Sequence, residues 1–304
     1  ILAMVSKPDF DPNDIDTVWQ EANAEGSTSS VLLNRATQGL YPPGSTFKVL
    51  TALTYIRQYP RKYEKYTYNC SQSEAIFNSV SVHCYGHKTH GQQDLSEALA
   101  NSCNQAFADI GTQLNVNKWK DTLESFLFNQ SLPYMDASAT SRFTLDGKSD
   151  KGYIPQTAFG QGDTLITPLH NAMIVSTIAN GGLMMKPYLI DKVQNNTGDE
   201  VSSTEPEAYR RLMTDNEAAL LGELMKGVVQ NGTASSLNGR GYTVAGKTGS
   251  AEYNESGASH SWFIGYSNVD DPDIVVSVIV EDGGTGSEAA VPIAADVFDA
   301  YYFD

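Results

Sequence analysis

One turn-to-helix segment constrains this chain more than any other part of the sequence. The Pro-Pro-Gly run at 42–44 is incompatible with a regular helix, whereas residues 46–58 are mostly good helix formers. Ser45 is therefore expected at or just inside a helix N-terminus, where unpaired backbone N–H groups and the positive end of the helix dipole gather. Lys48 follows one turn later on the same face, so its amine can approach the Ser45 hydroxyl.

This serine and lysine have two interpretations on their own. Ser45 can cap the helix while Lys48 lies on a solvated face, which is an ordinary structural arrangement. Alternatively, Lys48 is the base that removes the proton from Ser45, because a serine is a poor nucleophile at neutral pH. Partial burial and a neighbouring cation would lower the lysine pKa enough for that role. Other parts of the chain must decide between the two.

Composition limits the class of protein and its partners. The chain has 304 residues, 40% of them apolar and 18% charged, which is typical of a soluble globular protein with an ample core. Its net charge of −16 argues against nucleic acid or an anionic membrane surface as a partner. The sequence contains no apolar run long enough to span a bilayer and no signal peptide. Because it opens on an apolar run without an initiator Met, we expect a fragment that lacks an N-terminal anchor and any pedestal domain.

The pattern of apolar residues predicts an α+β fold, with an antiparallel sheet flanked by helices and a mostly helical part. We expect a single domain over 1–304, with the sheet in 1–58 and 188–304 and the helical part in 59–187. Segment 59–91 shows no sustained periodicity and is expected to be rich in loops. The predicted helices are 46–58, 94–100, 104–114, 117–128, 167–181, 214–232 and 289–303. The predicted strands are 1–6, a hairpin over 188–203, and a meander of 242–253, 260–268 and 273–281.

Two further short motifs accompany Ser45 and Lys48. Ser-Cys-Asn at 102–104 lies between two predicted helices, and Lys-Thr-Gly-Ser at 247–250 lies on the first strand of the C-terminal meander. S-x-x-K, S-x-N and K-T-G in this order are the signature of serine β-lactamases and penicillin-binding proteins. Each motif is weak alone, but here the three occur in order and each on the expected element.

With these motifs the chain resembles the transpeptidase domain of a penicillin-binding protein, and is most similar to the class B proteins of cell-wall elongation or division. The resemblance covers essentially the whole chain. It is carried by Leu-Tyr-Pro-Pro-Gly-Ser-Thr-Phe-Lys at 40–48, Ser-Cys-Asn-Gln-Ala-Phe at 102–107, Phe-Gly-Gln-Gly at 159–162, Thr-Pro-Leu at 167–169, Ala-Gly-Lys-Thr-Gly-Ser-Ala-Glu at 245–252 and His-Ser-Trp-Phe-Ile-Gly-Tyr at 260–266.

The resemblance implies a role for each catalytic residue. Ser45 would attack the carbonyl of a D-Ala-D-Ala stem peptide and form an acyl-enzyme. Lys48 would be the base, its pKa lowered by the nearby cation of Lys247. Ser102 would relay a proton to the leaving group, and Asn104 would hold Lys48 or the substrate amide. No cofactor is expected for this chemistry.

The resemblance also implies a substrate-binding strand. The hydroxyls of Thr248 and Ser250, together with Lys247, suit the terminal carboxylate of the peptide or of a β-lactam. Gly249 is expected to leave room for the substrate backbone alongside the strand. Backbone N–H groups of Ser45 and Ser250 would form the oxyanion hole.

Two other functions use the same motifs and remain open at this point. A serine β-lactamase needs a base that activates water, and no clear Glu-containing loop of that kind stands between Asn104 and Lys247. A non-catalytic β-lactam sensor would be acylated once and signal; the Gly-Gln-Gly run at 160–162 argues against it. For a transpeptidase, the implied partners are peptidoglycan stem peptides, β-lactam antibiotics and cell-wall polymerase, divisome or elongasome proteins. Its implied location is the extracytoplasmic face of the bacterial membrane.

The cysteines suggest a metal site. Cys70, Cys84 and Cys103 are the three cysteines of the chain, and with His90 they would make a closed Cys₃His tetrahedral zinc site. Their irregular intervals are weak evidence. The resemblance adds to it, because some elongation-type penicillin-binding proteins carry a zinc beside the active site with one ligand inside the S-x-N motif, as Cys103 would be here.

The alternative for the same cysteines is a disulfide between Cys70 and Cys84, which is natural outside the cell and would leave Cys103 as a small buried thiol. His83 or His87 could also replace the expected histidine ligand. The zinc site would fix a loop that has no periodic core of its own, and so hold the S-x-N motif in place.

Overall fold

The computed structural model describes residues 1–134, 137–252 and 259–303. Its largest sheet has three antiparallel strands in the order β11-β10-β9: β9 is Val244–Glu252, β10 is Ser259–Ser267 and β11 is Ile274–Val280. This confirms the predicted α+β class and the C-terminal meander, although Tyr253, the last residue of the first predicted strand, lies outside the described residues. Within this sheet β9 is an edge strand, so one of its sides is open to a ligand.

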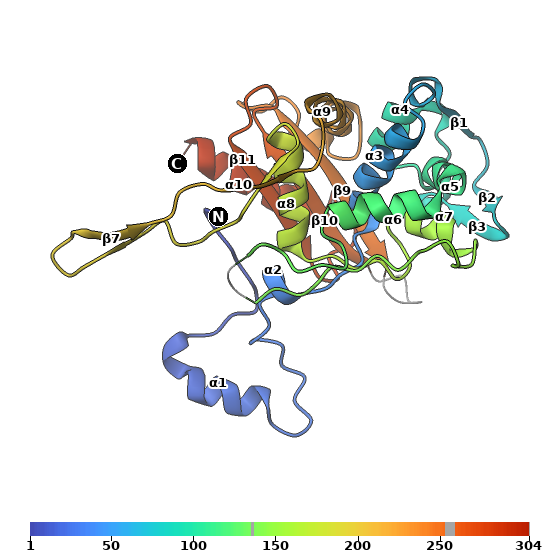
Figure 1. Ribbon diagram of the computed structural model, residues 1–304. Helices are drawn as coiled ribbons and strands as arrows, with labels where there is room; N and C mark the ends of the chain where they lie inside the picture. The colour runs from blue at the N-terminus through green and yellow to red at the C-terminus, as the bar shows by residue number, and fades with distance from the viewer. Residues whose placement is uncertain (135–136, 253–258, 304) are drawn as a thin grey trace.

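Three helices pack against this sheet (Figure 1): α8 (Pro168–Ala179), α9 (Asp215–Asn231) and α10 (Ala290–Phe303). Local sequence sets where two of them begin. Thr167 caps α8 ahead of a proline at the first helical position, and Thr214 forms a capping box with Glu217 at the start of α9. All three helices were predicted, and their bounds agree with the prediction to within one or two residues.

A group of helices around Ser45 makes up the neighbouring part of the molecule. The 3₁₀ helix η2 (Gly44–Phe47) leads into α3 (Lys48–Gln58), around which lie α4 (Leu95–Ala100), α5 (Asn104–Gln113), α6 (Val116–Ser125) and α7 (Tyr153–Ala158). The predicted helix at 46–58 is thus confirmed, but its first turn is 3₁₀. Phe47 anchors this turn in an aromatic cluster with Trp119, Phe128 and Phe143. Burial of these rings holds Ser45, two residues away, in a fixed place.

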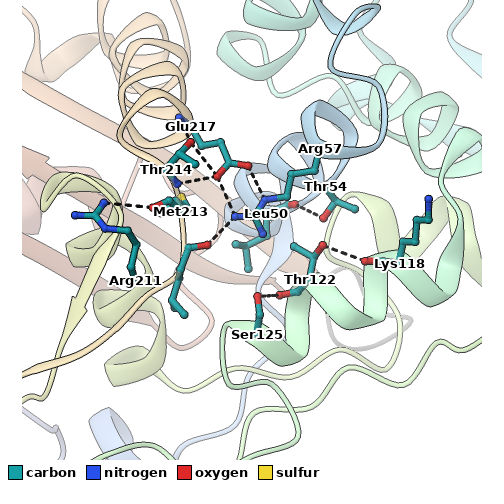
Figure 2. Close-up of polar contacts among 11 residues, drawn as sticks. Leu50, Thr54, Arg57, Lys118, Thr122, Ser125, Arg211, Met213, Thr214 and Glu217 are labelled. Atoms are coloured by element: carbon teal, nitrogen blue, oxygen red, sulfur yellow. Dashed lines mark hydrogen bonds and ion pairs between the residues drawn. The ribbon is translucent and has the colours of Figure 1, made fainter.

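An ion pair ties α3 to α9. Figure 2 shows Arg57, near the end of α3, reaching Glu217 at the start of α9, with Nε–Oε1 and Nη2–Oε2 distances of 2.7 and 3.1 Å. The same guanidinium donates to the carbonyl of Leu212 at 2.6 Å, and Glu217 also accepts from the backbone N–H of Thr214. The two-point contact fixes the helix of Lys48 against the helix that borders β9.

Short elements complete the fold. In segment 59–91 the prediction of loops was incomplete, because the structure forms two ladders, β1 with β4 and β2 with β3. Strands of four residues are too short to show a periodicity. The remaining elements are η1 (Pro12–Asp14), α1 (Ile15–Ala22), α2 (Arg35–Gln38), η3 (Tyr63–Lys65), β1 (Thr67–Cys70), β2 (Glu74–Phe77), β3 (Val80–His83), η4 (Tyr85–His87), β4 (Gly91–Asp94), β5 (Leu183–Met185), β6 (Lys192–Gln194), β7 (Glu200–Ser203), β8 (Ala208–Arg211) and η5 (Ser235–Leu237).

The predicted strand at 1–6 is wrong, since these residues belong to no strand. Leu2 and Val5 are 81% and 73% exposed, so the apolar run finds no sheet to cover it. Ser6 instead bonds to loop 33–35, through Leu33 O at 3.1 Å and Arg35 N at 2.9 Å. The hairpin predicted at 188–203 is confirmed as β6 and β7, which project from the body of the molecule (Figure 1). Among the described helices, none combines the length and apolar character needed to cross a bilayer.

Candidate active site

Ser45 is the second residue of η2, as the helix breakers before it predict. Two contacts fix the turn that presents it: the N–H of Gly44 donates to the carbonyl of Gly160 at 3.0 Å, and the indole of Trp262 donates to the carbonyl of Pro42 at 3.0 Å. Gly160 has φ +85°, and a Cβ there would lie 1.9 Å from the carbonyl oxygen of Gly44. Only glycine allows this approach, which gives the resemblance at 159–162 a structural reason.

Lys48 is fully buried, and its amine lies at the centre of a hydrogen-bond network. Its Nζ is 3.0 Å from Ser45 Oγ, 2.7 Å from the carbonyl oxygen of Ser102 and 2.7 Å from Oδ1 of Asn104. The interpretation of Lys48 as a residue on a solvated helix face is therefore wrong. The structure brings together the first two sequence motifs, S-x-x-K and S-x-N, at a single nitrogen atom.

Ser102 joins the second motif to the third. Its Oγ lies 3.2 Å from Lys48 Nζ and 3.0 Å from Lys247 Nζ, so one hydroxyl contacts two amines. Its φ of +54° is in the left-handed region, which is uncommon for a residue with a side chain. Asn104 is held from its other end, because its Nδ2 donates to the carbonyl of His83 at 3.0 Å. The five predicted catalytic residues thus form one connected cluster.

Both lysines have a lowered pKa. Burial lowers the pKa of Lys48 to about 8, against a smaller opposing effect of Cys84 and Cys103. Burial, and then the nearby Lys48 ammonium, lower the pKa of Lys247 well below its usual value. Of the two expected causes, partial burial and a neighbouring cation, burial is the main one for both lysines. Two amines around one hydroxyl favour a state in which at least one of them is neutral.

The third motif lies on the edge strand. Thr248 and Ser250 line a cleft of about 900 Å³ together with Ser45, Ser102 and Asn104. Ser250 Oγ accepts from the N–H of Gly286 at 3.2 Å. Gly249 also packs closely on its neighbours, because a Cβ there would meet Thr46 and Trp262 at 3.0 Å each. The packing of η2 and β10 thus favours glycine at this position.

Other lining residues were not found from the sequence. Thr233, on the turn after α9, has its Oγ1 2.5 Å from the Oγ1 of Thr248. The only signal for this segment was Gly232, which ends the predicted helix. The lining residues Tyr85, Lys88 and Glu288 also lie outside the sequence motifs, whereas Gln161 and Glu252 fall in the stretches at 159–162 and 245–252 that carry the resemblance.

The Cys/His cluster forms as predicted, with Cys70, Cys84, His90 and Cys103. One ligand atom from each lies within 4.8 Å of all the others, and the three cysteines are free thiols. The sulfurs of Cys70 and Cys84 are 3.9 Å apart, too far for the alternative disulfide. His83 stacks on His87 with 4.4 Å between the ring centroids. The histidine that lies beside the thiols is therefore His90, and not His83 or His87.

The cluster lies directly against the catalytic network. Cys103 is the residue between Ser102 and Asn104, and it also caps α5, where its Sγ accepts from the N–H of Ala106. The hydrogen bond between Cys84 and Cys103 lowers the pKa of the first thiol and raises that of the second. Thus any group held by these thiols would also hold the backbone that presents Ser102 to both lysines.

Comparison with known proteins agrees with this geometry. The sequence profile of the penicillin binding protein transpeptidase domain matches residues 1–299. The peptidoglycan D,D-transpeptidase PbpA of Mycolicibacterium smegmatis is 33% identical over 313 residues, which cover 96% of this chain and 62% of that protein. A protein of the same name from Mycobacterium tuberculosis is 32% identical and 64% covered. The chain therefore spans a little under two thirds of the length of these relatives.

Solved structures match over the same extent. The D,D-transpeptidase domain of a peptidoglycan glycosyltransferase from Eggerthella lenta has a TM-score of 0.87 at 30% identity, with 99% of this chain and 75% of that chain covered. The imipenem acyl-enzyme complex of penicillin-binding protein A from M. tuberculosis has a TM-score of 0.86 at 29% identity, with 99% and 70% covered. The match of nearly the whole sequence and the three motifs gathered around one cleft lead to one conclusion: the chain belongs to the penicillin-binding protein transpeptidase family.

Proposed function

We propose that this chain is the catalytic domain of a peptidoglycan D,D-transpeptidase, which cross-links stem peptides through an acyl-enzyme on Ser45 and is acylated there by β-lactams. The observation that carries the proposal is the buried amine of Lys48, 3.0 Å from the Ser45 hydroxyl. A neutral amine has two N–H donors and one lone pair. Ser102 O and Asn104 Oδ1, both 2.7 Å away, accept the two N–H groups, which leaves the lone pair for the proton of Ser45.

The reaction consists of two successive acyl transfers at Ser45. Ser45 Oγ attacks the carbonyl carbon of the penultimate D-Ala while its proton passes to Lys48, and the bond to the terminal D-Ala breaks. Ser102, which bridges Lys48 and Lys247, passes its own proton to the departing amine and takes in its place the proton that Lys48 received from Ser45. An acceptor amine then attacks the ester carbonyl of the acyl-enzyme, gives up a proton through the same groups, and restores the Ser45 hydroxyl. Backbone N–H groups of Ser45 and Ser250 stabilise the oxyanion, each worth about 3 kcal/mol.

Substrate binding is assigned to the edge strand. Thr248 and Ser250 present hydroxyls to the cleft, and Lys247 lies beside them, so the C-terminal carboxylate of the peptide or of a β-lactam binds here. Gly249 supports this strand by allowing it to pack on Trp262.

Hydrolysis and sensing are less well supported. Among the described lining residues the carboxylates are Glu252 and Glu288, and both follow Lys247 in the chain. In the described cleft wall, the segment between Asn104 and Lys247 therefore supplies no carboxylate to activate water, as a β-lactamase would require. Turnover assays separate the three functions. A transpeptidase exchanges peptides, a β-lactamase hydrolyses the antibiotic rapidly, and a sensor is acylated once and stays acylated.

Location and protein partners follow from the substrate. Peptidoglycan stem peptides are cross-linked outside the cell membrane, so we place the domain at the extracytoplasmic face. One solved neighbour, 27% identical with a TM-score of 0.83, belongs to a peptidoglycan synthase complex that coordinates polymerization and crosslinking. We infer a cell-wall polymerase or other elongation or division proteins as partners of this chain.

The first test concerns the nucleophile. Incubation with benzylpenicillin should give one adduct by intact-mass spectrometry, and Ser45→Ala should give none, because Ser45 combines a place at the start of the helix with a hydroxyl 3.0 Å from the amine of Lys48. Ser287→Ala, which removes another hydroxyl that lines the cleft, should still form the adduct. Uptake of one equivalent by Ser45→Ala would show that the nucleophile is a different residue.

We further propose that Cys70, Cys84, His90 and Cys103 hold one zinc ion. The separations that the structure gives are 3.6 to 3.9 Å for Cys70–Cys84, Cys84–Cys103 and Cys70–His90. A tetrahedral site with Zn–S bonds of about 2.3 Å has edges of roughly 3.8 Å, so the donors fit. Three thiolates and an imidazole make a closed structural site. Its contribution is to hold the 70–90 loops and Cys103 in place, and no step of the reaction passes through it.

Elemental analysis of protein purified without added metal tests this proposal. We expect about one zinc per chain, and three thiols on denaturation in the presence of a chelator. Cys84→Ser should lower the zinc content and the melting temperature. The matched control His87→Gln changes a histidine of the same loop that lies outside the cluster, and should leave both unchanged. Substoichiometric zinc with a single free thiol would contradict the proposal in favour of the disulfide.

A further inference from the structure

Thr233 lies beside Thr248 in the wall of the cleft. Their hydroxyl oxygens are 2.5 Å apart, and both residues line the cleft that contains Ser45. One belongs to the turn after α9 and the other to β9, so the contact joins two elements that reach the site independently. None of the three sequence motifs includes Thr233.

The backbone around Thr233 is held firmly. Its N–H donates to the carbonyl of Ala100 at 3.2 Å, and the next N–H, of Ala234, returns to the carbonyl of Val228 at 3.2 Å. A Cβ on Gly232 would lie 2.2 Å from Ala100 O, so only glycine lets the turn come this close. Because Ala100 precedes the Ser102 motif by two residues, this turn is fixed to both the second and the third motif.

The hydroxyl pair has a defined hydrogen-bonding capacity. Two hydroxyls have two protons, and the contact between Thr233 and Thr248 uses one of them. The other proton is free to donate into the cleft. A hydroxyl that accepts a hydrogen bond also becomes a better donor, because hydrogen bonds in a chain polarise one another. With the amine of Lys247 next to it, this donor suits an anionic oxygen better than a neutral one.

We propose that Thr233 is a positioning residue of the carboxylate subsite: it orients the Thr248 hydroxyl toward the terminal carboxylate and so selects substrates that carry one. This inference rests on the proposed transpeptidase function and refines its substrate recognition. Thr233 acts through Thr248 and takes no part in bond formation at Ser45.

The test compares two probes that differ at the carboxyl group: benzylpenicillin carries a free carboxylate, and its carboxyl methyl ester is neutral there. The rate of Ser45 acylation by each is measured by intact mass for the parent, Thr233→Val and Thr233→Ser. Val keeps the shape of the side chain and removes the hydroxyl. We expect Thr233→Val to lose about tenfold or more with the free acid, the value of one hydrogen bond to a charged group, and to change little with the ester. Thr233→Ser should restore most of the rate with the acid.

Controls separate recognition from folding and from the function itself. Thr243→Val removes a hydroxyl just before the same strand, where it bonds only to the Val269 N–H among the described residues, and should keep the parental ratio of rates. Equal losses with acid and ester, or no loss with either, would overturn the inference while leaving the transpeptidase function intact. A parent protein that forms no adduct would overturn the function itself. If Thr233→Val does not fold, Thr233→Ala is judged by the same ratio.

Discussion

At the scale of single residues, the site depends on two buried lysines for which the described residues provide no carboxylate partner. Lys48 and Lys247 are both fully inaccessible, and carbonyls and hydroxyls provide the hydrogen bonds that the structure shows for each amine. A buried ammonium with dipolar partners alone loses solvation without gaining an opposite charge, and so the neutral form is favoured. This environment gives a lysine the properties of a base near neutral pH.

Acylation by benzylpenicillin should therefore rise with pH. With the Lys48 pKa at about 8, its neutral fraction grows from roughly a tenth at pH 7 to nine tenths at pH 9, so the rate should increase about tenfold. The nearby groups whose charge affects the pKa of Lys48 are Lys247, Cys84 and Cys103. Because negative charge on the two thiols raises this pKa, its loss would shift the midpoint of the profile to lower pH. Intact-mass spectrometry of samples quenched at set times measures the acylation rate at each pH, with a correction for the hydrolysis of benzylpenicillin in buffer alone. A flat or falling profile would exclude neutral Lys48 as the base.

Sequence reasoning reached the charged members of the site because each lies in a short motif with its own spacing. It missed Thr233, since a hydroxyl after a helix end has no pattern, and only the fold brings it to 2.5 Å from Thr248. For the pKa of Lys48 it named two causes, partial burial and a neighbouring cation, without ranking them; in the structure burial is the first cause. Burial is a property of the packed structure, and a sequence shows which charges exist but not how much water reaches them.

At the scale of elements, the turn before Ser45 is held by a second turn from a distant part of the chain. Gly160 accepts from the N–H of Gly44 while approaching it more closely than any side chain allows. The predicted element types near the site were correct where periodicity or capping residues were present, as for α4, α8 and α9. They failed for β1 to β4, whose pairing depends on contacts between short segments.

Gly160→Ala should destabilise the protein and slow acylation of Ser45. A side chain at φ +85° costs about 1–2 kcal/mol, and the contact with Gly44 O adds to it, so the total should reach at least about 2 kcal/mol. The matched control is Gly198→Ala, in the projecting hairpin, which has φ +89° but no atom within 4 Å of the added Cβ. Thermal unfolding and acylation rates of both variants measure the difference. Equal behaviour would mean that strain alone, and not the contact with Gly44, accounts for the effect.

At the scale of the whole molecule, the site lies where the sheet meets the helices around α3. Residues 45–48, 102–104 and 247–250 come from distant parts of the chain and meet at Ser102, while Arg57 and Glu217 hold the surrounding helices together. The class of fold followed from the sequence because the C-terminal strands and their helices have clear periods. The positions of residues 1–6 and of α1 could not be predicted, because the local sequence does not determine whether an apolar segment packs against another element. Trp19 of α1, for example, is 59% exposed.

The Ser-Cys-Asn segment has a consequence for how resistance to β-lactams can arise in such a protein. Ser102 and Asn104 form hydrogen bonds with Lys48, and Cys103 between them is buried among the thiols. Each of these three consecutive residues is therefore constrained by its own contacts. Under the proposed transpeptidase function, a heritable change at any of them should disturb the turnover of the natural peptide as much as the reaction with the drug. Alterations compatible with that function should therefore gather at exposed lining residues of the cleft, such as Ser287 and Glu288.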